Sequence, residues 1–177
     1  MTMQCPSCGN ALSEVAAAGV KSHACAGGCG GLWLRILEVR KLRERLPGQG
    51  APLLFVERAE GVRLFRNPEH PCPHCQTTLL YRHCFSRKQE IEIDQCSKCG
   101  GYWIDPGRLG KLGDTKLDEE KKKELAREFF AELFDQRVKN MNLVNHDTLE
   151  SAKEVVRIFR FITPVAYAPA TPPLELD

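Results

Sequence analysis

Cysteine is the residue type in this chain whose number and spacing point most directly to chemistry. The 177 residues contain nine cysteines, and eight of them form four close pairs. Disulfides rarely join residues so near in sequence, whereas two such pairs on adjacent tight turns supply the four thiolates of a tetrahedral metal site. We therefore expect the paired residues to be metal ligands: Cys5, Cys8, Cys25, Cys29, Cys72, Cys75, Cys96 and Cys99.

The cysteine pairs belong to an internal repeat. The segment CPSCGNAL at residues 5–12 matches CPHCQTTL at residues 72–79, and CAGGCGGLWL at 25–34 matches CSKCGGYWI at 96–104. Zinc with four cysteine ligands is usually structural, and two pairs joined by a short hairpin suit it. The repeat predicts two structural zinc ions, each held by four cysteines.

Two other residues compete for a chemical role. His23 lies close enough to Cys25 to be an alternative ligand in the first copy, whose second cysteine pair is one residue longer than usual. We keep four cysteines there because the repeat aligns Cys29 with Cys99. Cys84 follows His83, as in a nucleophile beside its base, but neighbours in a strand point to opposite faces, and both zinc sites are complete without Cys84.

The repeated motif resembles the transcription factor IIB-like zinc ribbon, whose pattern is CPxC, a spacer, and then CxxCGGxWLDxGEL. The first copy has Arg35 and Leu37 at the Asp and Gly positions but keeps Glu38, and the second keeps Asp105 but has Arg108 at the Glu position. The resemblance implies a ribbon fold with structural zinc. It covers the two cysteine-rich copies and does not extend past residue 115, and it implies little about activity.

Short strands and helices must position these cysteines. Alternating apolar residues predict strands at 79–82 and 90–94, and the corresponding hairpin at 15–24 is more weakly marked. Helical spacing of apolar residues predicts a helix at 34–46. A further turn of helix is expected to begin at Asp105-Pro106 and run to about residue 112.

The remaining segments carry weaker patterns. Residues 53–65 are read as a hairpin around Glu60-Gly61, and 115–141 and 148–162 as two helices forming a helical hairpin. The fold class is thus a small metal-bound α+β protein with two tandem zinc ribbons and a C-terminal α-helical hairpin. The expected division is residues 1–48, first ribbon and following helix; 49–70, linker; 71–113, second ribbon; 114–162, helical hairpin; and 163–177, proline-rich tail.

The two C-terminal helices carry more apolar surface than a hairpin of two helices can bury by itself. This surface must therefore pack on the ribbons, on a second copy of the chain, or on a partner. We expect it to form the partner-binding face, with contacts from Phe129, Phe130, Leu133, Phe134, Val156 and Phe159.

Charge and composition narrow the possible functions. The formal net charge is +2, but two zinc sites with four thiolates each would lower it to about −2. The basic residues between Arg35 and Arg45 are interrupted by Glu38 and Glu44, which favours a solvated face. No segment is apolar enough to span a membrane, and we expect a cytoplasmic protein.

No nucleophile elbow, phosphate-binding glycine loop or zinc-hydrolase motif occurs, so we expect a protein that is not an enzyme. The favoured hypothesis is a non-catalytic zinc-binding adaptor that docks a protein partner or a second copy. Nucleic-acid binding in a transcription-related setting is the alternative. A thiol-redox switch or holdase that releases zinc on oxidation is the third.

Overall fold

The structure is a computed structural model that describes residues 2–46, 48–65, 70–86, 91–104 and 146–163, with scattered positions between 118 and 131. Each cysteine-rich copy forms three antiparallel strands. These are β1 (Ser13–Ala17), β2 (Val20–Ala24) and β3 (Leu32–Leu34) in the first copy, and β4 (Leu80–Ser86), β5 (Ile91–Cys96) and β6 (Tyr102–Ile104) in the second. The expected hairpins at 15–24 and across 79–94 are confirmed.

The two ribbons join edge to edge into one six-stranded sheet. The strand order is β1-β2-β3-β6-β5-β4, and β3 pairs with β6 in antiparallel orientation. Trp33 lies opposite Trp103, flanked by the pairs Leu32 with Ile104 and Leu34 with Tyr102. This register relates the ribbons by an approximate twofold axis through the two tryptophans. The linker between the ribbons therefore does not separate them in space.

The sheet has two different buried faces because successive side chains of a strand point to opposite sides. Leu32, Leu34, Tyr102 and Ile104 belong to an apolar core on one face, whereas the two tryptophans belong to a second core with the metal-site cysteines on the other. The zinc sites and the main apolar core are thus separated by the thickness of the sheet.

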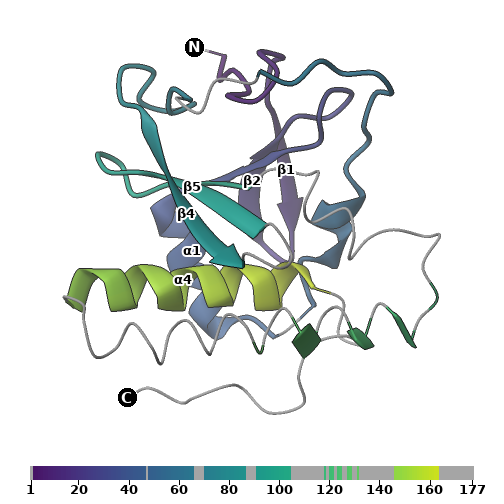
Figure 1. Cartoon of the computed structure of the whole chain (residues 1–177), viewed down its shortest axis with the longest axis vertical. Helices are drawn as coiled ribbons and strands as arrows, with labels where there is room; N and C mark the ends of the chain where they lie inside the picture. The colour runs from purple at the N-terminus through teal and green to yellow at the C-terminus, as the bar shows by residue number, and fades with distance from the viewer. Residues whose placement is uncertain are drawn as a thin grey trace.

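Helix α4 (His146–Ile162) covers the apolar face and matches the second expected helix within two residues at its start. Figure 1 shows it crossing the sheet at the end of the molecule away from the two Cys-Pro loops. Val156 and Phe159, which the sequence assigns to a partner-binding face, lie in this core and are 8% and 0% exposed. Their apolar stripe is covered by the chain's own sheet, which corrects that assignment.

The first of the two expected C-terminal helices lies mostly outside the described residues, as do Phe129, Phe130, Leu133 and Phe134. The described positions from 120 to 131 are helical, but the helical hairpin itself is not confirmed. The short helix expected at 105–112 and the tail at 164–177 also lie outside the described residues. No helix among the described residues has the length and apolar run needed to cross a bilayer.

The segment after the first ribbon is helical and then follows the ribbon's surface. Helix α1 (Ile36–Lys41) continues into the 3-10 helix η1 (Leu42–Glu44), which gives a shorter helical stretch than expected. The hairpin expected at 53–65 is wrong. Ala51–Phe55 forms the 3-10 helix η2. Among the described residues that follow, Arg58 pairs with Gly28 and Phe65 bonds to Ser7, both in the first ribbon.

Four backbone hydrogen bonds define the course of this linker. The N–H of Gly27 donates to the carbonyl of Glu57, and the N–H of Ala59 donates to the carbonyl of Gly28. Farther back, Gly48 and Gly50 donate to the carbonyls of Arg160 and Phe161. The last turn of a helix lacks internal donors for its carbonyls, so the linker caps the C-terminus of α4.

Candidate metal centre

The first group of four cysteines comes from two tight turns at one end of β1 and β2. The sulfur of Cys5 lies 3.4 Å from that of Cys29, and the sulfur of Cys8 lies 3.5 Å from that of Cys25. In the second group the corresponding distances are 3.7 Å for Cys72 with Cys99 and 3.9 Å for Cys75 with Cys96. Within each group all four sulfurs lie within 4.8 Å of one another.

These distances fit zinc. A zinc–sulfur bond of ~2.3 Å in tetrahedral geometry separates neighbouring sulfurs by ~3.8 Å. Four thiolates complete a tetrahedral shell, which is the arrangement of structural zinc. All eight predicted ligands are brought together as the sequence indicated, in two sites: Cys5, Cys8, Cys25 and Cys29, and then Cys72, Cys75, Cys96 and Cys99.

Each tight turn has the same backbone design. The residue after the second cysteine has a positive φ, and its N–H donates to the carbonyl of the first cysteine. Glycine fills three of these positions at the lowest conformational cost: Gly9, Gly30 and Gly100. Gln76 holds the fourth with φ 60°. The longer turn between Cys25 and Cys29 is accommodated by Gly27, whose φ is also positive.

Within the first site, burial and hydrogen bonds between the cysteines shift the pKa values of individual thiols in different directions. The pKa of Cys29 is lowered to about 6, chiefly by a hydrogen bond from the Cys5 thiol, and that same bond together with burial raises the pKa of Cys5. Burial also raises the pKa of Cys25 to about 11, and it does the same for Cys99 in the second site. Without metal, Cys5, Cys25 and Cys99 are therefore neutral thiols at neutral pH, and each must lose its proton when zinc binds.

The two tryptophans shield the metal sites. Trp33 and Trp103 are 0% and 1% exposed, so neither ring is accessible for stacking on a base at the surface. The indole N–H of Trp103 donates to the hydroxyl of Ser7 at 3.0 Å, in the Cys-Pro turn of the other ribbon. Trp103 therefore links the second ribbon to the Cys-Pro turn of the first.

Three further residues are placed by the structure. His23 lies in β2, opposite Glu14 and Trp33, and neither group of four sulfurs includes it. Burial lowers the pKa of His23. Cys84 pairs with Glu92 through the backbone of β4 and β5. Each group of four sulfurs is complete without Cys84, and its absence from the zinc sites stays a prediction.

Sequence reasoning missed two residues that brace the first ribbon. His70 is buried, and its Nδ1 lies 2.6 Å from the carbonyl oxygen of Pro6. Glu38 is also buried, and it accepts bonds from the Nζ of Lys41 at 2.7 Å and the backbone N–H of Lys21 at 2.9 Å. Its retention in the motif was the available signal. Nothing comparable marked His70.

Comparison with known proteins agrees with this geometry. A family model described as "Transcription factor zinc-finger", the ribbon of the transcription factor IIB type, matches residues 4–45 and 71–115. No curated protein and no solved structure matches the chain. The two matched regions contain the two groups of four cysteines, and each covers one three-stranded unit. The chain thus contains two tandem zinc ribbons of the transcription factor IIB type.

Proposed function

We propose that the protein is a non-catalytic adaptor in which two structural zinc ions hold a rigid platform for a protein partner. The observation that carries this proposal is the composition of the two sites. Each has four sulfur ligands, whereas catalytic zinc keeps a position for water or substrate. The metals then act through the fold, and the function lies on the surface that they hold in place.

A groove between the two Cys-Pro turns supports docking of a partner. It is open, has a volume of about 1580 Å³, and is lined by Pro6 and Pro73 with Leu64 and Phe65. Leu64 and Phe65 are 45% and 55% exposed. Pockets for small molecules measure ~300–1,000 Å³, so this groove suits a segment of a protein better. Exposed neighbouring apolar residues are typical of such binding surfaces.

The groove is also held in a defined shape. The N–H of Phe65 donates to the carbonyl of Ser7 at 2.8 Å, and its ring lies over Gly9. Cys5 and Cys72 both line the groove, and each zinc site with four thiolates carries a net charge of about −2. Arg63 also lines the groove, so charges of both signs border its apolar residues. The expected partner segment is therefore extended, with an apolar side chain for the groove and charged residues of both signs beside it.

Affinity capture with the zinc-loaded full chain, followed by titration of the captured protein, tests this proposal. Phe65→Ala should weaken binding by roughly 30-fold or more, as expected for an anchor residue at an interface. Phe55→Ala is the matched control, because Phe55 is 61% exposed, close to the 55% of Phe65, and does not line the groove. Equal loss of affinity in both variants, or none in either, would reject the groove as the docking site.

A second candidate function is nucleic-acid binding. Arg40, Lys41 and Arg45 lie on α1 and just after η1, next to α4 and away from the zinc face of the sheet. The family description also links similar ribbons to transcription. Binding to duplex DNA that falls steeply with salt would support this function, because phosphate contacts release counterions. Docking of a protein in the groove depends instead on Phe65, so the effect of Phe65→Ala distinguishes the two candidate functions.

A further inference from the structure

A small basic pocket lies where the last turns of α4 meet the end of η1. It has a volume of about 290 Å³ and is lined by Leu42, Arg45, Arg157, Arg160 and Phe161. Leu42 and Phe161 are buried and supply its apolar part. Three guanidinium groups from two elements distant in sequence thus border one cavity.

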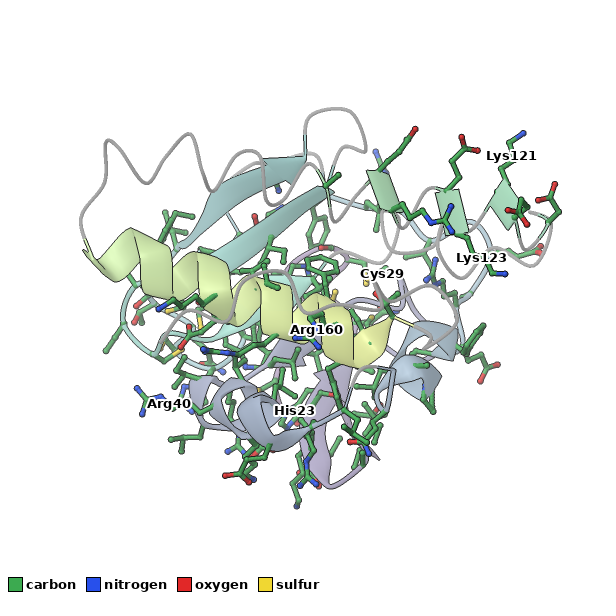
Figure 2. The ribbon with its side chains drawn as sticks, turned by 90° about the horizontal axis from the view of Figure 1, so that it is seen from below. His23, Cys29, Arg40, Lys121, Lys123 and Arg160 are labelled. Carbon is green, nitrogen blue, oxygen red and sulfur yellow. The ribbon has the colours of Figure 1, made fainter. Side chains whose placement is uncertain are left out.

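The fold explains why these arginines share one site. Arg157 and Arg160 are three residues apart in α4, so they project from the same side of the helix. Their neighbours Ile158, Phe159 and Ile162 are buried in the core, which places both arginines at the border of the helix and η1. Figure 2 shows Arg160 on α4 and Arg40 projecting well away from it.

The third arginine, Arg45, reaches the pocket from the end of η1 rather than from α4. A terminal nitrogen of Arg45 lies 3.3 Å from where a side chain of Gly19 would begin, so the guanidinium rests against the turn between β1 and β2. Gly19 leaves room for it there. Arg45 is otherwise exposed, and no carboxylate is found among the described residues that line the pocket.

Arg160 supplies the observation that points to a ligand. Its Nε atom is buried and has no hydrogen-bond acceptor within the described part of the chain. A buried donor without an acceptor costs free energy, so the site favours a bound group with acceptor oxygens.

An alternative explanation for the position of these arginines is that their positive charge stabilises the negative, C-terminal end of the α4 helix dipole. The carbonyls of Arg160 and Phe161 at that end already accept bonds from Gly48 and Gly50. The linker thus satisfies those two carbonyls, and the Nε of Arg160 still has no acceptor within the described residues.

We propose that this pocket binds a single phosphate group. Arginine is the preferred side chain for phosphate because its planar donors match two oxygens at once. The volume is at the lower limit for ligand pockets, so it suits one compact oxyanion rather than a whole cofactor. The phosphate comes either from a small phosphorylated molecule or from a nucleic-acid backbone.

Calorimetric titration of inorganic phosphate into the zinc-loaded full chain tests the site, with chloride at matched ionic strength as reference. We expect saturable binding at one site. Arg160→Gln and Arg45→Gln should each weaken it by roughly tenfold or more. Arg40→Gln is the control because Arg40 is exposed and does not line the pocket. Its affinity for phosphate should stay unchanged.

Two results would overturn the proposal. One is the absence of saturable binding, and the other is an equal effect in all three variants, which would indicate diffuse attraction to a basic surface. Circular dichroism and zinc content check that each variant folds, and Arg45→Gln carries the test if Arg160→Gln does not. Competition between phosphate and a short single-stranded oligonucleotide identifies nucleic acid as the source, whereas binding of phosphate without competition identifies a small molecule.

Discussion

Trp33 and Trp103 lie directly opposite each other across β3 and β6, and each indole covers a glycine of the other ribbon. The indole of Trp103 lies over Gly31, and that of Trp33 lies over Gly101. The repeated sequence Gly-Gly-x-Trp is therefore an interface motif within this chain. Its second glycine in one ribbon makes room for the tryptophan of the other.

Gly31→Ala and Gly101→Ala should each destabilise the chain, because the added methyl group would overlap the opposite indole. Overpacking of this kind costs ~1–3 kcal/mol. Denaturant unfolding measures the loss. In the double variant Gly31→Ala with Trp103→Phe, the smaller ring should relieve part of the overlap, so its destabilisation should be less than the sum of the two. Simple additivity would argue against the contact.

Elemental analysis should find two zinc ions per chain. Cys29→Ser and Cys96→Ser should each lose one ion, because each removes one of four sulfur ligands. Cys84→Ser is the control and should retain both. A single zinc ion in the unmodified chain, or loss of zinc in Cys84→Ser, would mean that the ligands are wrongly assigned.

Zinc binding should release protons and weaken in acid. The pKa of Cys25 and of Cys99 is raised by burial to about 11, so both are thiols in the metal-free protein at neutral pH. Each thiol must lose its proton to bind zinc, so the affinity should fall roughly tenfold per pH unit for every proton released. Competition with a chelator at several pH values measures this slope. A slope of zero would contradict it.

Glu38→Gln should destabilise the first ribbon at neutral pH. Burial alone would raise the pKa of Glu38, but the bonds from Lys41 and the Lys21 backbone lower it overall. A lowered folded pKa stabilises the protein above the unfolded pKa of ~4.3, and this contribution is lost as the pH falls through the folded value.

The expected loss for Glu38→Gln is ~1–3 kcal/mol, constant between about pH 8 and pH 5, where the carboxylate is ionised in both states. Unfolding measured at several pH values checks this. Glu44→Gln is the control, because Glu44 is exposed and should change stability little. A loss that varies across this range would assign the effect to another group.

Tyr102→Phe should loosen α4 from the sheet. The buried hydroxyl of Tyr102 donates to Glu154 of α4 at 2.6 Å and accepts a bond from Gln95 at 2.9 Å. Removing it should cost ~1.5–3 kcal/mol, because one partner is a carboxylate, and should speed amide hydrogen exchange in α4. Tyr81→Phe is the control, since Tyr81 is 44% exposed and its hydroxyl donates to Gln95 within the sheet rather than to α4. Equal exchange in both variants would contradict this role.

The sequence by itself determined the zinc sites. Ligand spacing within a tight turn is a local property, so the eight cysteines and their division into two groups could be predicted from the repeat. The strands next to them and α4 could be predicted as well, because alternating or helical spacing of apolar residues reports which side of an element is buried. The same patterns do not report what covers that side.

The tertiary structure decided which element covers each apolar side. The stripe of Val156 and Phe159 is the same whether the sheet or another protein covers it, and only the fold places it on the sheet. Strands β3 and β6 are short, and their pairing depends on contacts between residues seventy positions apart, such as Trp33 and Trp103. His70 is buried for the same reason, because its bond to Pro6 joins the two ribbons. Contacts between segments so far apart produce no periodic spacing of residues in the sequence. The spacing within one segment does not show which other segment it will contact.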